Sequence, residues 1–279
     1  SNFRNGMLIT LAVIIAFGCF VSANAAPQDE SRSETDDSYY YATKDKEPIP
    51  SLWDDVWKLP DVIVEDTSEI ISDDDDLFWL LAAGSASIAM HNSGADQRIA
   101  EGTFDEPQIN EDLDEIMYLV GGPGFHFAFT GAWYLWDAET GDIEGQEEAW
   151  TMLKALSVTG TLTLGLKAAR NNDTPNGKSW AWPSGHTSSS FTVAAILDEL
   201  YGPEVGWPAY IGASAIGWRM MDSGDHWASD VLFGGVLGYI VGHHVAGKHE
   251  PNRLAGFEVI PLTTFDNEPA MGLGLHKRF

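Results

Sequence analysis

The sequence predicts an all-α fold, a bundle of about six helices followed by a short β-like C-terminal tail. Three observations predict it: apolar segments rich in Ala and Gly recur along the chain, polar loops separate them, and most are too long for strands. The chain has 279 residues, 44% of them hydrophobic, which is enough to bury one substantial domain with extensions. The predicted helical segments are residues 77–90, 116–136, 149–169, 187–200, 205–221 and 229–245.

The N-terminal segment has the pattern of an export signal. Arg4 precedes an apolar run over residues 8–21, and an Ala-Asn-Ala sequence ending at Ala25 supplies a small-x-small cleavage site. We therefore predict a signal peptide over residues 1–25 and a periplasmic location. Cleavage there would remove Cys19, the only cysteine, and the mature protein would contain no disulfide.

Composition divides the rest of the chain into three parts. Residues 26–50 are polar, charged and poor in aliphatic side chains, which predicts a flexible acidic linker. Residues 51–249 contain the six apolar segments and form the predicted helical domain. Residues 250–279 contain two strand-like runs around a turn sequence at residues 266–269, which predicts a terminal hairpin or an extended arm.

Two features of the helical domain bear on its architecture. Three glycines and a proline at residues 121–124 should kink or break the second segment. A membrane-spanning helix needs about 20 predominantly apolar residues, several segments are shorter, and the mean hydropathy is −0.13. We favour a folded periplasmic domain, although residues 149–169 and 229–245 are nearly uncharged, so membrane association or integral helices stay open as alternatives.

The chain is strongly acidic, with a formal net charge of −27. This charge argues against nucleic acid or an anionic membrane surface as a general partner. The acidic residues cluster mostly outside the motifs described next, so we interpret them as a solvated exterior around a locally basic site. The sequence leaves the oligomeric state open.

A turn followed by a helix start, at residues 181–190 (AWPSGHTSSS), is the most informative stretch. A proline, a small hydroxyl residue and a glycine turn the backbone, and Ser and Thr residues suit the cap of the helix that follows. The free N–H groups and the positive dipole end of such a helix favour a bound phosphate. His186, in the first turn, could add proton transfer.

Two further stretches complete an ordered set. Residues 166–175 contain Lys167, and residues 219–230 contain Arg219 before His226 and Asp230. His226 and Asp230 lie four residues apart where a helix begins, so their side chains can share one face, and the carboxylate can orient the imidazole. The ordered set resembles the three-part signature of the type-2 phosphatidic-acid phosphatase superfamily, which also includes bacterial acid phosphatases and vanadium haloperoxidases.

The resemblance implies a role for each matching residue. His226 is then the nucleophile that forms a phosphohistidine, Asp230 orients it, and His186 is the general acid. Lys167 supplies positive charge to the phosphate. Ser184 and the backbone N–H of Gly185 donate hydrogen bonds, and Arg219 could clamp two phosphate oxygens.

The chain departs from the family pattern at two positions. Thr174 stands where the Arg of the Arg-Pro pair is expected, and its hydroxyl can donate one hydrogen bond but supplies no charge. Arg170, if it lies on the same helix as Lys167, could compensate. Arg219 stands one residue further from His226 than the usual spacing, so that Met220 occupies the expected position.

We therefore predict a phosphatase that hydrolyses a phosphate monoester or a pyrophosphate, small or lipid-linked, through a metal-free phosphohistidine intermediate. No metal or other cofactor is required, since histidines and cationic donors fill every role. The alternative is a catalytically impaired family member that acts as an envelope scaffold or a phosphate-binding protein. Vanadium-dependent halide oxidation ranks below both. All of these predictions except the scaffold need His186 and His226 to lie at one site.

Overall fold

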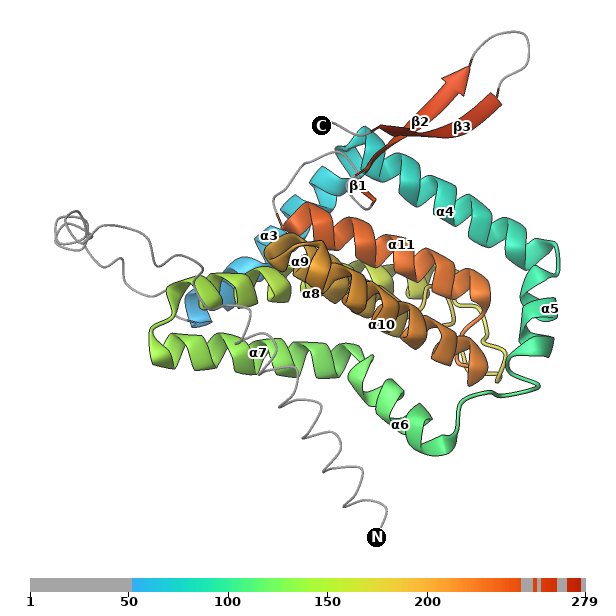
Figure 1. The fold of residues 1–279 in the computed structure, drawn as a ribbon, viewed down its shortest axis with the longest axis horizontal. Helices are drawn as coiled ribbons and strands as arrows, with labels where there is room; N and C mark the ends of the chain where they lie inside the picture. Colours follow the sequence, from blue (N-terminus) through green and yellow to red (C-terminus); the bar gives the residue numbers. More distant parts are fainter. Residues whose placement is uncertain (1–51, 247–252, 255–256, 265–269, 277–279) are drawn as a thin grey trace, which may run out of the picture.

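The computed structural model describes residues 52–246, 253–254, 257–264 and 270–276; the predicted signal peptide and linker lie outside the described residues. Between residues 52 and 246 the structure has nine helices (Figure 1). They are α3 (Leu52–Ser72), α4 (Asp74–Asn92), α5 (Ala95–Gly102), α6 (Glu111–Val120), α7 (Pro123–Thr140), α8 (Ile143–Arg170), α9 (Gly185–Tyr201), α10 (Pro203–Asp222) and α11 (Ala228–Val245).

The helical fold class is confirmed for this part of the chain, but the number of helices is larger than the sequence predicts. Two helices, α3 and α5, were not predicted. The segment predicted over residues 116–136 is divided between α6 and α7, because α6 ends at Val120 and Pro123 opens α7. Gly121 lies so close to Ile216 of α10 that an added Cβ would be 2.5 Å from Ile216 Cγ2. The glycines therefore allow both the break and the close approach of α10.

Polar side chains fix where the helices begin. Asp73 accepts hydrogen bonds from the backbone N–H groups of the first turn of α4, and Asn110 does the same for α6. Asp142 caps α8, and Ser184 caps α9. These side chains satisfy N–H groups that have no acceptor within the helix.

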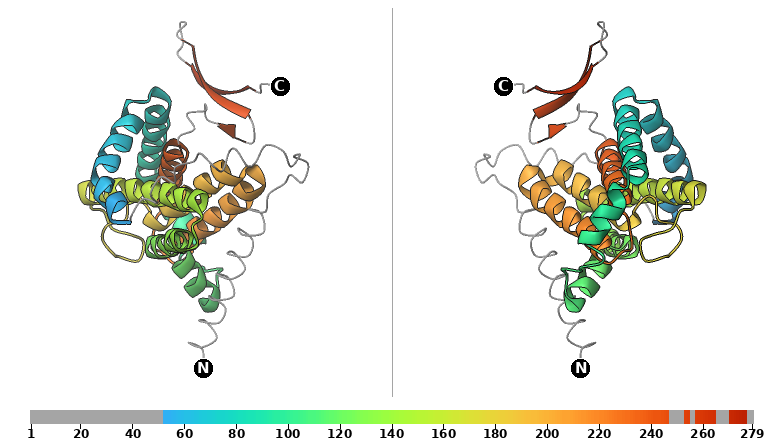
Figure 2. Two further views of the ribbon diagram at one scale, coloured as in Figure 1. Left: turned by 90° about the vertical axis from the view of Figure 1, so that its left-hand side faces the viewer. Right: turned by 90° about the vertical axis from the view of Figure 1, so that its right-hand side faces the viewer.

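The core lies where α9 packs between α10, α11 and α8 (Figures 1 and 2). Buried side chains of α8, α9 and α11 fill most of it, among them Leu156, Ile196 and Leu237. The helices α9 and α11 approach very closely, since a Cβ added to Gly238 would lie 2.1 Å from the carbonyl oxygen of Ser188. The helix α4 packs against α11 and the helix α3 against α8, and they add Ala83 and Ile70 to this core. The tight α9–α11 contact holds the N-terminal ends of these two helices in a fixed relation.

Among the residues that the structure describes, no helix combines the length and the apolar character that a bilayer crossing requires.

The C-terminal segment contains three short strands, β1 (Arg253–Leu254), β2 (Phe257–Thr264) and β3 (Ala270–His276). They pair antiparallel in the order β1-β2-β3, with Glu258 opposite His276 and Thr264 opposite Ala270. The two strand-like runs of the sequence coincide with β2 and β3. The division of the chain at residues 50 and 250 stays a prediction.

Candidate active site

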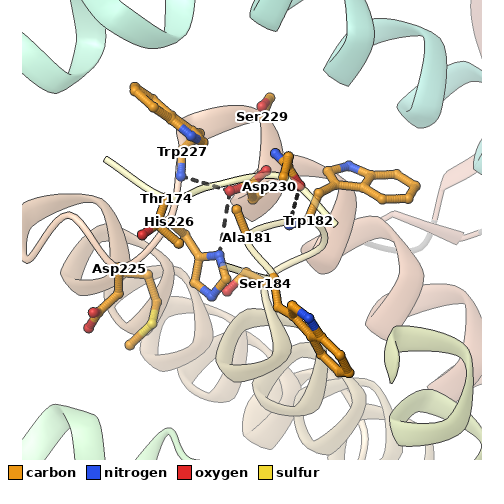
Figure 3. Close-up of polar contacts among 12 residues, drawn as sticks. Thr174, Ala181, Trp182, Ser184, Asp225, His226, Trp227, Ser229 and Asp230 are labelled. Atoms are coloured by element: carbon orange, nitrogen blue, oxygen red, sulfur yellow. Dashed lines mark hydrogen bonds and ion pairs between the residues drawn. The ribbon is translucent and has the colours of Figure 1, made fainter. Parts of the chain in front are cut away.

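Three loops meet at one end of the helices and bring the three motifs together (Figure 3). The backbone N–H of Ser184 donates to the carbonyl of Asp230 at 3.1 Å, which ties the start of α9 to the start of α11. Asn172, in the loop after α8, accepts from the backbone N–H of Trp182 through its side chain, at 3.0 Å. The indole N–H of Trp227 donates to the carbonyl of Asp173 at 2.8 Å. Residues more than 50 positions apart therefore share one hydrogen-bonded loop cluster.

His226 and Asp230 face one another across the start of α11. Nδ1 of His226 lies 3.5 Å from Oδ2 of Asp230, and the same oxygen accepts the backbone N–H of Trp227 at 2.9 Å (Figure 3). Both side chains are buried. Burial lowers the pKa of His226 and the Asp230 carboxylate opposes that shift, so the imidazole is neutral at neutral pH. With Nδ1 facing the carboxylate, Nε2 is the nitrogen left to react.

The carboxylate of Asp96, on α5, fixes the start of α11 through hydrogen bonds to Ser229. This buried side chain accepts from the backbone N–H of Ser229 at 3.0 Å and from its hydroxyl at 2.7 Å. It also contacts Nδ1 of His91 at 3.1 Å. Asp96 thereby fixes the residue next to Asp230. The sequence offered no signal for this role, because an acidic residue in the first turn of a helix is common.

His186 lies in the first turn of α9, beside two other histidines. Burial, together with the charges of His226 and Arg219, lowers the pKa of His186 to about 4. The ring of Tyr118, on α6, packs on the His186 ring with 4.8 Å between centroids. His126, on α7, is also buried, and its pKa falls to about 4 through burial and the charge of His186. His186 therefore lies within electrostatic range of both His226 and His126.

Lys167 supplies positive charge beneath the same loops. Its ammonium donates to the backbone carbonyls of Trp180 and, at 3.2 Å, Ala181. Burial lowers its pKa to about 8, while the carboxylate of Asp230 acts in the opposite sense. Lys167 is therefore mostly protonated at neutral pH and lies within electrostatic range of the Asp230 carboxylate.

Ser184 and the N-terminus of α9 offer hydrogen-bond donors. The hydroxyl oxygen of Ser184 accepts from the N–H of Thr187 at 3.3 Å and from its hydroxyl at 2.9 Å, which leaves the Ser184 hydrogen for another acceptor. The N–H groups of Gly185 and His186 lie in the first helical turn, where the helix provides no acceptor. This end of α9 has the donor set of an anion site.

Three other residues that the sequence analysis selected are engaged elsewhere. Arg219 is only 5% exposed, and its guanidinium pairs with the carboxylates of Asp114 and Asp225. The hydroxyl of Thr174 hydrogen-bonds within the turn formed by residues 174–178. The guanidinium of Arg170 stacks on the ring of Trp182, 5.2 Å from its centroid.

Asp114, Asp225 and Tyr118 are site residues that sequence reasoning missed. Burial would raise the pKa of Asp225, but hydrogen bonds from Lys178, Asn176, Arg219 and Ser223 hold it well below the usual range. Asp114 belongs to the acidic residues that the sequence analysis assigns to a solvated exterior, and Tyr118 belongs to the helical segment predicted over residues 116–136. The one-residue shift of Arg219 was the only available signal, because it turns the arginine toward α6.

Comparison with known proteins places this geometry in a family. Residues 123–253 match the model of the PAP2 superfamily. The matched range is 131 of the 279 residues, so this part of the chain is similar to the PAP2 superfamily. This confirms the resemblance carried by the three motifs, and the matched range includes His186, His226 and Asp230.

Individual PAP2 relatives are distant. The chain is 38% identical over 65 residues to the lipid A 1-phosphatase of Porphyromonas gingivalis, which covers 22% of this chain and 15% of that protein. The crystal structure of a transmembrane PAP2 type phosphatidylglycerolphosphate phosphatase from Bacillus subtilis is similar with a TM-score of 0.50 and 22% identity, over 62% of this chain and 94% of that one. LpxE from Aquifex aeolicus gives a TM-score of 0.42 and 20% identity, over 51% and 89%. The Bacillus structure shows that the fold is shared.

Proposed function

We propose that this PAP2 protein is a phosphoric ester hydrolase that cleaves a phosphate monoester or a pyrophosphate through a phosphohistidine on His226. One observation carries the proposal: the two imidazoles from distant motifs, His186 and His226, are close enough for the charge of one to lower the pKa of the other. Lys167 and the N-terminus of α9 supply the positive potential that a phosphoryl group needs beside them.

The proposed reaction has two displacement steps. In the first, Nε2 of His226 attacks phosphorus, the bond to the leaving oxygen breaks, and protonated His186 donates a proton to that oxygen. In the second, His186 takes a proton from water, the water oxygen attacks phosphorus, and the N–P bond breaks to release inorganic phosphate. Asp230 stabilises the positive charge that develops on His226 in both steps.

Protonation of His186 depends on the substrate. In the free protein its pKa is about 4, so it is neutral at neutral pH. A bound phosphate dianion favours the imidazolium, since an opposite charge nearby raises a histidine pKa. The substrate thus brings the general acid into its active form, and a general acid contributes about 10²- to 10⁴-fold to the rate.

A lipid-linked phosphate is the substrate class that we propose first. The PAP2 relatives are a lipid A 1-phosphatase and a phosphatidylglycerolphosphate phosphatase. In this chain, two aromatic side chains beside the site are half-exposed, Tyr118 at 52% and Trp180 at 46%. Such rings can contact the apolar part of a substrate. A periplasmic location with membrane contact belongs to the same proposal.

The second candidate is an impaired PAP2 member that binds phosphate without turnover. The engagement of Arg219 with two carboxylates favours it, together with the closed turn around Thr174. Arg170, stacked on Trp182, is the residue proposed to compensate. Compensation requires that Arg170→Ala lower turnover much more than Lys178→Ala.

The deciding experiment measures hydrolysis of a chromogenic phosphate ester and of a lipid phosphate in the presence of EDTA. We expect turnover in the wild type, at least about 10³-fold less in His226→Ala, and about 10²- to 10⁴-fold less in His186→Ala. Phosphate or vanadate binding without turnover would favour the impaired protein. Full activity in His226→Ala would refute the phosphohistidine mechanism.

A further inference from the structure

The helix α6 meets the site through two residues one turn apart, Asp114 and Tyr118. No side chain of α6 is fully buried, so packing contributes little to its position. Asp114 instead pairs with Arg219 of α10, and the ring of Tyr118 lies between Arg219 and His186. The guanidinium carbon of Arg219 is 4.9 Å from the centroid of the Tyr118 ring.

Each of the three nitrogens of the Arg219 guanidinium donates a hydrogen bond to a carboxylate. Nε donates to Oδ1 of Asp114 at 2.6 Å and Nη2 to Oδ2 of the same residue at 2.8 Å. Nη1 donates to Asp225 at 2.7 Å. The two parallel bonds to Asp114 form the fork by which arginine also binds two oxygens of a phosphate. The fork formed by Nε and Nη2 is therefore not open to a phosphate while it holds Asp114.

The site is otherwise nearly balanced in charge. Lys178 pairs with Asp225, and Arg219 pairs with Asp225 and Asp114. Lys167 donates to backbone carbonyls instead. Since the charge of Arg219 lowers the pKa of His186, its guanidinium acts on the reacting groups even in this paired state. Arg219 is therefore a second cation near the proposed phosphate site, and the carboxylates of Asp114 and Asp225 neutralise its charge.

We propose that Asp114 is an internal counter-ion that competes with the substrate phosphate for Arg219 and so sets the affinity of the site for phosphate. This inference rests on the proposed phosphate site. An arriving phosphate takes the place of the Asp114 carboxylate on the guanidinium, which releases the first turn of α6 from α10, while Gly121 and Gly122 still connect the end of α6 to α7. The apparent affinity is then the intrinsic affinity reduced by the fraction of molecules in which Arg219 is free.

The test compares calorimetric dissociation constants for orthophosphate and orthovanadate, which do not require turnover. We expect Asp114→Asn to tighten binding of both anions by at least about fivefold. The matched control is Asp112→Asn, which removes the same charge from an exposed position in the same helical turn and should change binding less than about twofold. In an Arg219→Ala background, Asp114→Asn should give no tightening.

The outcomes separate the two proposals. If the wild type binds the anions and Asp114→Asn binds them equally or more weakly, the counter-ion role of Asp114 is refuted, but the proposed phosphate site is not. Equal tightening with and without Arg219 also overturns it, because the effect would then be general electrostatics. If neither wild type nor variant binds either anion, the phosphate site itself fails. Thermal unfolding checks the fold of each variant, and Asp114→Ala serves in place of Asp114→Asn if the latter does not fold.

Discussion

The two sides of the site differ in what their polar groups already hold. On the histidine side, His186, His226, Ser184 and the start of α9 keep reactive or donating atoms available. On the arginine side, Arg219 is paired with carboxylates, and the Thr174 hydroxyl is bonded within its own turn. Both sides consist of the segments that carry the PAP2 motifs, yet only the histidine side keeps every residue of the pattern.

The contrast follows from helix geometry. On an α-helix, a shift of one position turns a side chain by about 100° around the axis. Arg219 therefore points away from the direction of Met220, which is fully buried in the core. In its shifted direction the guanidinium reaches α6, and Asp114 is placed to receive it. We therefore propose that the histidine side retains the chemistry of the site, whereas the pair of Asp114 and Arg219 sets the strength of phosphate binding.

The largest expected effect tests the histidine side. Asp230→Asn should lower kcat by about 10²- to 10⁴-fold, because an amide neither fixes the reactive tautomer of His226 nor stabilises its positive charge. Single-turnover kinetics with a chromogenic ester would measure the loss. The control is Asp137→Asn, which changes a buried aspartate of α7 and should leave kcat within about twofold. A normal kcat in Asp230→Asn would refute the role of Asp230 in orienting and stabilising His226.

The next effect concerns stability in acid. His126 has a folded pKa of about 4, below the 6.5 of the free side chain. Between these pH values the unfolded chain binds more protons than the folded one, so the free energy of unfolding falls as pH is lowered. The shift corresponds to at most about 3 kcal/mol, lost between pH 6.5 and 4. His126→Gln should therefore flatten the stability curve in this window, as measured by urea denaturation at several pH values.

His244 serves as an internal comparison, because its pKa is raised by folding whereas that of His126 is lowered. It contacts the carboxylates of Asp76 and Glu69, and the hydrogen bond that it donates to Asp76 raises its pKa. Its contribution to stability is complete below pH 6.5 and is lost as pH rises through the folded pKa. His244→Gln should change the curve above pH 6.5 and leave the acid window nearly unchanged. The same flattening in both variants would show that the acid effect does not come from His126.

The histidine side could be proposed from the sequence, because local chemistry determines its geometry. A Pro-Ser-Gly turn before a helix and a His-x-x-x-Asp spacing each dictate their geometry within a few residues. The helical segments were predictable for a similar reason, since length and apolar composition are local properties. The helices α3 and α5 were missed, because a high content of acidic residues masks their helical character: Asp54 and Asp55 begin α3, and Asp96 begins α5.

The arginine side could not be predicted, because its partners are distant in the sequence. Asp114 lies 105 residues before Arg219, and an acidic cluster gives no indication of which carboxylate is structural. Asp96 is a similar case, 133 residues from Ser229. Such pairs depend on how α5, α6 and α10 pack in the folded protein. Local sequence patterns do not show which distant helices will meet.

The smallest expected effect tests whether the Thr174 hydroxyl is engaged only within its own turn. The hydroxyl of Thr174 accepts the N–H of Lys178 at 2.9 Å and has Asn176 Oδ1 within 2.7 Å as an acceptor. Thr174→Ala should therefore lower the free energy of unfolding by about 1–2 kcal/mol, the cost of an unsatisfied buried group, and change kcat/KM by less than about threefold. Thr174→Ser, which keeps the hydroxyl, should restore most of the stability. A tenfold loss of kcat/KM at unchanged stability would mean instead that this hydroxyl donates to the phosphate, and the two sides of the site would then act together.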